Sequence, residues 1–305
     1  MKILVAGTGG VGGYFGAKLA RAGESVTFLA RGEHLTAIRS AGLRIRSGDG
    51  EWVVRSAATD DPQSVGRVDL VLFCVKSFDT EPVARAILPA VGGETVLLSL
   101  QNGVDNEEKL EAVVGRGRVL GGAAYIFSAI EAPGVIVHTY GGRIAFGELD
   151  GRESERGRRL LQVFKTAGIP SELSTQIRRL LWEKYLLITA SGGLTALTRC
   201  PVGVVRSVPE TRRLFVTLLE ELAQIAKAAG APLLPGVVDA VVASADALAP
   251  GVYSSLYHDL TQGKRLEIEA LQGHALRLGE KLGVPAPALS ALYAALAPYR
   301  DGPPG

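Results

Sequence analysis

Short apolar runs alternate with helical periodicity in the first half of the chain. The runs at 2–7 and 25–30 flank a helical stretch at 11–22, which together predict a βαβ unit. The runs at 68–76 and 95–100 are almost continuously apolar, which is typical of strands buried on both faces of a parallel sheet. This half therefore predicts an α/β fold with a doubly wound parallel sheet.

Three shorter patterns complete the prediction for this half. Residues 43–57 read as a hairpin that turns at a Gly-Asp-Gly sequence. Asp105 followed by Glu108 is typical of a helix start. Residues 134–149 are expected to form a second antiparallel pair that closes this half.

Helical periodicity dominates from about residue 174, and Pro and Gly separate the apolar stretches. We expect helices over 175–191, 209–229, 235–248 and 264–283. A chain of 305 residues also exceeds what one hydrophobic core usually serves. The sequence therefore predicts a Rossmann-type domain over 1–173, an all-helical C-terminal domain for substrate and dimerisation over 174–305, and a ligand cleft between them.

Composition narrows the classes of partner. The net charge of +2 offers no field for a polyanion, so nucleic acid is not expected, and the alternating charges of 151–159 predict a solvated helix face. The first apolar run is shorter than a signal peptide requires, and no window matches a membrane span. The two cysteines, Cys74 and Cys200, stand outside any metal-binding spacing, so no metal is expected. We expect a soluble, cytoplasmic protein without a membrane partner.

The sequence "GTGGVG" at 7–12 has the G-x-G-x-x-G spacing of a dinucleotide-binding loop. Gly7 permits a tight turn, Gly9 lets backbone approach a pyrophosphate, and Gly12 allows close packing of helix on strand. The loop follows an expected strand and opens an expected helix, which is the context that supports this interpretation. The expected cofactor-binding residues here are Gly7, Thr8, Gly9, Gly10, Val11 and Gly12.

The end of the second strand favours a phosphorylated cofactor. An NAD site would carry Asp or Glu there, whereas this chain has Arg31, and Glu33 is expected to face solvent at the next helix start. A guanidinium suits a 2′-phosphate, although Arg31 could also be only a surface residue. The sequence therefore favours NADP(H) over NAD(H).

Lys184 stands on an apolar helical pattern. It is three or four positions from Leu180, Leu181, Leu187 and Ile188, so a helix places all five on neighbouring strips of one surface. Either its stem reaches out to solvent, or the ammonium group is held at a site that uses a proton.

Polar residues also follow the two buried strands of the first half. Lys76 and Asn102 end these strands, where the ligand crevice of an open parallel sheet lies. Further on, residues 254–273 combine two serines with Glu267 early in a helical pattern. With these pieces in order, the whole chain resembles ketopantoate reductases (2-dehydropantoate 2-reductases). The resemblance rests on "GTGGVG", "VKSF", "QNG", "LWEKYLL", "LTALTRCPVG" and "SSLYHDLTQGKRLEIEALQG".

The resemblance implies NADPH-dependent reduction of a 2-keto acid to a 2-hydroxy acid, as from ketopantoate to pantoate in pantothenate and coenzyme A biosynthesis. Lys184 matches the family's general acid, which protonates the ketone oxygen. Glu267 matches the residue that orients a substrate hydroxyl, and Ser255 matches a serine that holds substrate. Asn102 and Lys76 match residues at the nicotinamide end of the site.

The chain departs from the family where asparagines usually follow the lysine by one and two helical turns. Those positions are Ile188 and Gly192. Losing one hydrogen bond to substrate commonly costs about 1–3 kcal/mol, so we expect a more apolar and roomier pocket. Either other groups, such as Thr189 or Ser191, bind ketopantoate, or the substrate is a less polar keto acid.

Two other functions stay open. A 3-hydroxy acid or polyol dehydrogenase shares the domain plan, but the segment with Ser255 and Glu267 argues against it. A non-catalytic NADP(H)-binding regulator would not need Lys184 together with Glu267. The apolar stretch at 212–230 could bury against its own domain or a second copy, so a homodimer also stays open.

Overall fold

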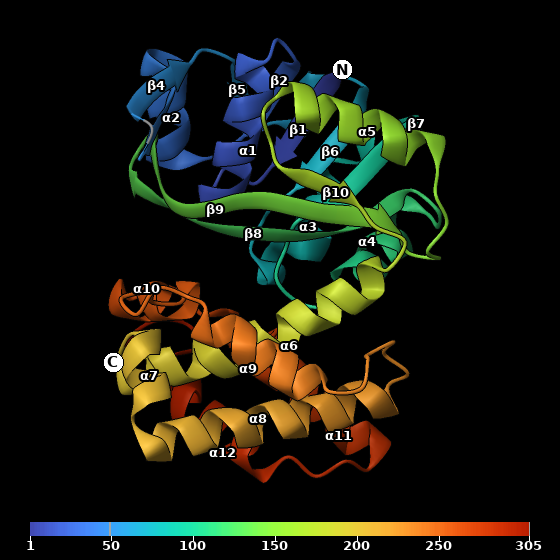
Figure 1. Ribbon diagram of the computed structural model, residues 1–305. Coiled ribbons are helices and arrows are strands. Elements are labelled where there is room, and N and C mark those ends of the chain that lie inside the picture. Colours follow the sequence, from blue (N-terminus) through green and yellow to red (C-terminus); the bar gives the residue numbers. More distant parts are fainter. Residues whose placement is uncertain (49, 305) are drawn as a thin grey trace. The chain divides into compact units, whose positions relative to one another are not determined.

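The computed structural model describes residues 1–48 and 50–304 (Figure 1). Its contacts divide the chain into two compact units. The first comprises Met1–Gln101 and Asp105–Ile177, and the second comprises Asn102–Val104 and the chain from Arg178 onward. The short loop Asn102–Val104 thus groups with the second unit, away from its neighbours in sequence. The predicted domain boundary after residue 173 stays a prediction.

A single mixed sheet organises the first unit. Its order is β4-β3-β9-β8-β7-β6-β1-β2-β5, with β10 paired to β9. The six strands β5-β2-β1-β6-β7-β8 are parallel neighbours in the order of a dinucleotide-binding sheet. The strands are β1 Lys2–Ala6, β2 Ser25–Leu29, β3 Leu43–Ser47, β4 Gly50–Val54, β5 Ala57–Thr59, β6 Val68–Phe73, β7 Val91–Ser99, β8 Val119–Ala132, β9 Val135–Glu148 and β10 Ser171–Leu173.

Helices cover both faces of this sheet, which confirms the doubly wound prediction. Helices α3 and α4 pack together over a core that contains Leu4, Phe73 and Leu110. On the other face, α1 packs over a core that contains Phe15 and Phe28. The helices are α1 Gly10–Arg21, α2 Gly32–Ala41, α3 Thr80–Ala86, α4 Asn106–Val114 and α5 Glu155–Thr166, with short 3-10 turns η1 Pro62–Val65, η2 Ser77–Asp79 and η3 Leu88–Ala90.

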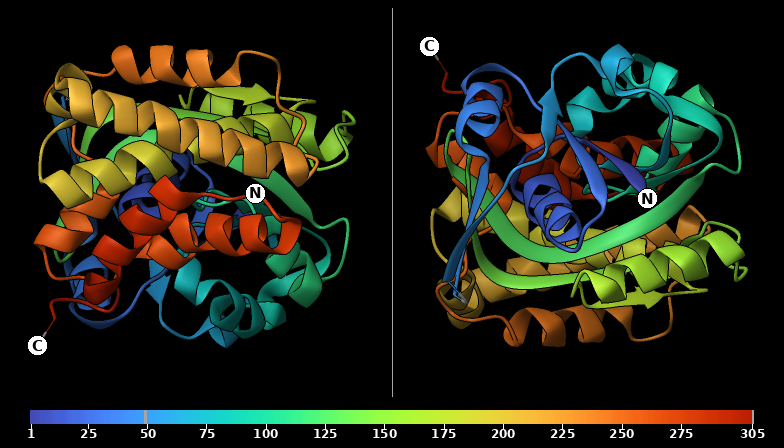
Figure 2. Two further views of the ribbon diagram at one scale, coloured as in Figure 1. Left: turned by 90° about the horizontal axis from the view of Figure 1, so that it is seen from below. Right: turned by 90° about the horizontal axis from the view of Figure 1, so that it is seen from above.

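Helix α1 contacts two parts of the same sheet, because β8 and β9 curve around it (Figure 2, right). A side chain on Gly16 would lie 2.7 Å from Phe28 of β2, and one on Gly13 would lie 2.9 Å from Ile136 of β9. The glycines of this helix therefore let strands approach it from two sides.

The prediction of an antiparallel pair within 134–149 is wrong. This segment is the single long strand β9, and its antiparallel partner is β8, which the sequence did not reveal. Within β9, Gly141 and Gly142 both have positive φ at a shift in the strand register. Glycine at such a position marks a bulge as readily as a hairpin.

The other local predictions fare better. Strands β3 and β4 form the expected hairpin, although Asp49 of its turn lies outside the described residues. Helix α4 begins directly after Asp105, as expected, and the carboxylate of Asp105 pairs with Lys109 at 2.7 Å. Strands β6 and β7 end at Phe73 and Ser99, so Lys76 and Asn102 follow the strands by three residues and do not end them.

The second unit is helical, as predicted. Helix α8 buries Phe215, Leu218, Leu222 and Ile225 in the core of its own unit, and a homodimer stays a prediction. None of the described helices is long and apolar enough to cross a membrane. The helices are α6 Ile177–Thr198, α7 Val202–Ser207, α8 Pro209–Ala228, α9 Val237–Asp246, α10 Ser255–Thr261, α11 Gln272–Leu282 and α12 Pro287–Leu296, with 3-10 turns η4 Glu267–Glu269 and η5 Ala297–Tyr299.

The prediction of one helix over 264–283 is wrong. Leu266 is extended, and its backbone N–H donates to the carbonyl of Arg300 (2.8 Å). That tertiary bond takes the chain out of helical geometry before Glu267. The 3-10 turn η4 follows, and helix α11 begins only at Gln272.

Candidate functional site

The glycine-rich loop in the first unit is tightly packed at Gly7 and open at Gly9. Gly7 has φ +97°, and a side chain there would lie 2.7 Å from the backbone nitrogen of Val75. At Gly9, directly before α1, no atom lies within 4 Å of where a side chain would begin. The opening thus stands at a helix N-terminus, where backbone N–H groups favour an anion.

Thr8 and Gly10 hold this loop in place by different contacts. Thr8 is 4% exposed, and its hydroxyl donates to the carbonyl of Leu29 at the end of β2 (2.9 Å). A side chain on Gly10 would lie 2.1 Å from the carbonyl oxygen of Ser128 in β8. Gly10 is therefore required by the packing of a distant strand, a reason that the loop spacing alone did not reveal.

Arg31 lies two residues beyond β2, as the sequence suggested, and Glu33 is exposed as expected. The guanidinium of Arg31 donates to the carboxylate of Asp79 (2.8 Å), and the Arg31 side chain is 81% exposed. Sequence reasoning missed Asp79, because nothing in its local pattern links it to a strand end so far away in the chain.

Lys76 and Asn102 fall in different units. Lys76 is half-buried at the start of the turn η2 in the first unit. Asn102 is half-buried and belongs to the second unit, where its neighbour Val104 packs against the helical core. The structure therefore groups Asn102 with the unit that carries Lys184 and Glu267.

Lys184 is half-buried on α6, beside the core face of that helix. The core face consists of Leu181, Tyr185 and Leu186, which are all buried. Leu187 and Ile188, which share the strip of Lys184, are only partly buried. The apolar surface around Lys184 is thus buried at Leu181, while Leu187 and Ile188 pack at the edge of the core.

Glu267 is 6% exposed in the turn η4. Two hydrogen bonds tie the residues after it to the helix of Lys184. The hydroxyl of Tyr185 donates to the carbonyl of Leu271 (2.6 Å), and the side-chain amide of Gln272 donates to the carbonyl of Thr189 (2.7 Å). These bonds fix the segment that carries Glu267 alongside α6.

The neighbour of Glu267 on this turn, Glu269, is held by basic and hydroxyl groups. Burial alone would raise the pKa of Glu269, but hydrogen bonds from Tyr293 and Arg277 outweigh burial and lower it. The ionised carboxylate also pairs with Arg300 at 2.9 Å. The turn is therefore anchored directly beside Glu267.

The two serines of the motif have different environments. Ser254 caps helix α10, where its hydroxyl accepts the N–H of Tyr257 (3.0 Å) and the hydroxyl of Thr195 (2.7 Å). It also lies 3.3 Å from the carbonyl of Gly192 on α6. Ser255, the serine that the resemblance selected, is exposed at the first position of the helix.

Gly192, one of the two positions without the family's asparagine, differs from its neighbour Gly193 in how closely other atoms pack against it. The atom nearest to a Cβ on Gly192 would be the Cβ of Ser254, at 4.0 Å, so a methyl group fits there. A side chain on Gly193 would lie 2.5 Å from Leu292 in the core. Gly193 is thus needed for packing, whereas a methyl group would fit at Gly192.

Of the two suggested substitutes for those asparagines, one is buried and the other is already hydrogen-bonded. Thr189 is fully buried, which removes it from any pocket wall. The hydroxyl of Ser191 donates to the carbonyl of Leu187 (2.6 Å).

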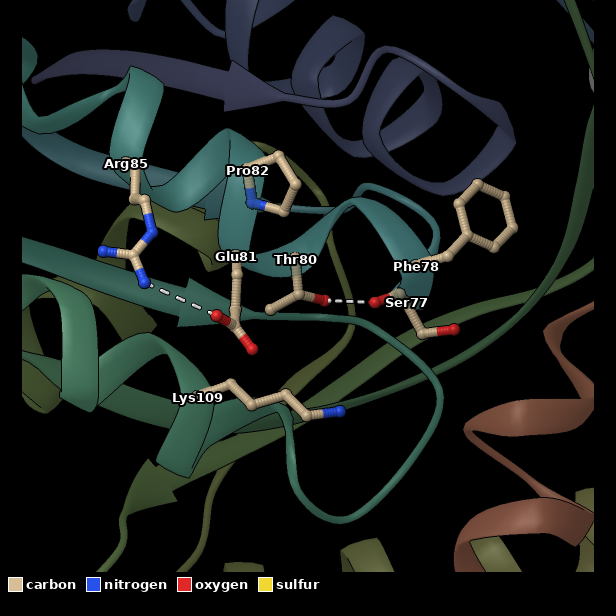
Figure 3. A pocket seen from close by; sticks show the side chains of 7 residues that line it. All are labelled: Ser77, Phe78, Thr80, Glu81, Pro82, Arg85 and Lys109. Atoms are coloured by element: carbon tan, nitrogen blue, oxygen red, sulfur yellow. Dashed lines mark hydrogen bonds and ion pairs between the residues drawn. The ribbon is translucent and has the colours of Figure 1, made fainter.

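A cavity of about 510 Å³ in the first unit lies next to the turn that carries Asp79 (Figure 3). Its cationic groups are Arg85, which pairs with Glu81, and Lys109, which pairs with Asp105. None of the expected site residues lines it, so we assign it no role in the site. Its lining is Ser77, Phe78, Thr80, Glu81, Pro82, Arg85 and Lys109.

Comparison with known proteins places the chain in a family. Residues 3–151 match the family described as Ketopantoate reductase PanE/ApbA, and residues 176–300 match its C-terminal part. The chain belongs to the ketopantoate reductase family. This confirms the resemblance seen in the sequence, and it makes the chain a member of an oxidoreductase family with a nicotinamide cofactor.

Full-length relatives of this family share the whole plan. The chain is 35% identical to a PanE/ApbA family ketopantoate reductase from Ralstonia eutropha JMP134, with a TM-score of 0.91 and 98% of each chain covered. It is 32% identical to 2-dehydropantoate 2-reductase from Halobacterium salinarum over 96% of each chain. It is also 32% identical to "Uncharacterized oxidoreductase YkpB" from Bacillus subtilis, covering 98% of this chain and 99% of that protein.

Proposed function

We propose that this protein is an NADP(H)-dependent 2-keto acid reductase whose substrate is less polar than ketopantoate. The family gives the reaction class, and the observation that carries the substrate class is the strip of α6 beyond Lys184. There, Ile188 offers no hydrogen bond, and Gly192 presents no side chain although a methyl group would fit. A pocket wall of this kind favours an apolar side chain on the keto acid.

The glycine-rich loop fits a dinucleotide. Gly9 leaves the N-terminus of α1 uncovered, and Thr8 fixes the loop to the strand that leads to Arg31. Backbone N–H groups at this helix end would bind the pyrophosphate, and Arg31 would bind a 2′-phosphate. When bound, the nicotinamide supplies a hydride.

The second unit supplies the groups for the keto acid. Lys184 would donate a proton to the ketone oxygen, and its charge would stabilise negative charge that develops there. Glu267 would accept a hydrogen bond from the substrate and orient it, while Ser255 and Asn102 would help to hold it. Lys76 would contribute from the first unit at the nicotinamide end.

The test is consumption of NADPH by the purified protein with ketopantoate and with branched and aromatic 2-keto acids. We expect kcat/KM to be highest for an apolar 2-keto acid. A clear preference for ketopantoate would reject the proposed substrate class and assign the protein to pantoate formation. Oxidation of 3-hydroxy acids with NAD⁺, or NADPH binding without turnover of any keto acid, would reject the reductase.

A further inference from the structure

The ion pair between Arg31 and Asp79 joins two segments at the cofactor end of the sheet. Arg31 follows β2, where the ribose of a dinucleotide lies in a sheet of this topology. Asp79 closes the turn η2 after β6, and its carboxylate reaches the guanidinium at 2.8 Å. A carboxylate is therefore in direct contact with the guanidinium that is proposed to recognise a 2′-phosphate.

The chain next to the acid of this pair is held by buried hydrogen bonds. Thr80, directly after Asp79, is 1% exposed; its hydroxyl donates to the carbonyl of Ser77 (2.9 Å), as Figure 3 shows. The buried side-chain amide of Gln101 donates to the same hydroxyl (2.8 Å) and to the carbonyl of Val75 (3.0 Å). The Arg31 side chain is 81% exposed and that of Asp79 is 27% exposed, so Arg31 has more room to turn toward a ligand.

We propose that Asp79 limits the preference of this protein for NADPH over NADH, an inference that rests on the proposed role of Arg31. A 2′-phosphate must share Arg31 with the carboxylate of Asp79, which also repels it. A 2′-hydroxyl carries no charge and can donate to that carboxylate, as to the acid of an NAD site. Asp79 thus weakens binding of NADPH and supports binding of NADH.

The experiment measures the dissociation constants of NADPH and NADH by fluorescence titration of Asp79→Asn, Arg31→Ala and the double variant. Asp79→Asn keeps the shape of the side chain and removes its charge. We expect it to tighten NADPH about tenfold while NADH is unchanged or weaker. The gain should be smaller in the Arg31→Ala background, because there is no guanidinium to release.

Glu172→Gln is the matched control, since Glu172 also pairs with an exposed arginine, Arg143 (3.2 Å), on strands β10 and β9. It should leave both constants unchanged. If Asp79→Asn moves both cofactors equally, or fails to tighten NADPH, the inference is wrong even when Arg31→Ala weakens NADPH selectively. If Arg31→Ala leaves the ratio of the two constants unchanged, the proposed NADP(H) site itself is wrong.

Discussion

The glycine-rich loop of the first unit and the helix α6 of the second unit prepare binding in opposite ways. The loop uses backbone: Gly9 leaves a helix end open, while Gly7 and Gly10 bring neighbouring backbone close. Helix α6 uses side chains, and at Gly192 it lacks one although a methyl group would fit. A site built from backbone, such as this loop, restricts which residues can occupy it. A site built from side chains, such as this face of α6, can change its ligand through one substitution.

The largest expected effect concerns the side chains of helix α6. Lys184→Ala should lower kcat for the best 2-keto acid about 10²–10⁴-fold, because positioned proton transfer contributes on that scale. The dissociation constant of NADPH should change little. Steady-state kinetics and fluorescence titration measure the two quantities, with Lys227→Ala on the exposed side of α8 as the control. Turnover near that of the unmodified protein would remove Lys184 from the proton transfer.

A pair of adjacent substitutions tests the backbone half. Gly10→Ala forces a methyl group against the Ser128 carbonyl, so we expect the free energy of unfolding to fall by about 1–3 kcal/mol or more. Gly9→Ala meets no atom within 4 Å and should leave stability nearly unchanged while weakening NADPH. Urea denaturation and cofactor titration separate the two. Equal stability of both variants would contradict the described contact between α1 and β8.

Restoring the asparagines would show how far α6 sets the substrate. Ile188→Asn and Gly192→Asn together should raise kcat/KM for ketopantoate relative to an apolar keto acid by about 10–100-fold, the scale of one or two hydrogen bonds. Gly192→Ala is the control for filling the space without adding a polar group. A ratio that shifts equally in both variants would show that the volume of the side chain, not its amide, decides selectivity.

The smallest effect concerns the stability of the first unit at low pH. Burial would raise the pKa of Glu148, but hydrogen bonds and charge from Arg156 outweigh it and lower the pKa. A carboxyl with a lowered pKa stabilises the fold above its unfolded value, near 4.3, and this contribution disappears as pH falls further. Glu148→Gln should therefore flatten the fall of unfolding free energy below about pH 4.5. An unchanged acid profile would show that this pair contributes nothing.

The sequence predicted the fold class because the spacing of apolar residues within each strand or helix shows which of its faces is buried. The alternation of strands with helices and the spacing of Gly7, Gly9 and Gly12 are local properties, and the structure has them as expected. Long-range contacts were not predictable in this way. The break before Glu267 depends on a hydrogen bond from Leu266 to Arg300. The segment 134–149 pairs with β8 and does not fold back on itself.

The candidate site divides along the same line. The order of the motifs pointed to Lys184 and Glu267 as site residues, and their roles remain predictions. The side-chain contacts of Asp79 with Arg31 and of Ser254 with Thr195 join segments far apart in sequence. No periodicity or spacing encodes such a pair, because each partner has an ordinary local pattern.

The curved ribbon of β8 and β9 also has a consequence for synthesis of the chain. Helix α1 leaves the ribosome early, with the strands that cover one of its sides, but Ser128 and Ile136 are made much later. Until translation passes Glu148, the other side of α1 lacks its covering strands. The nascent protein must therefore keep a nearly complete nucleotide loop in a half-covered state, where a chaperone could bind and where early cofactor capture would be weak.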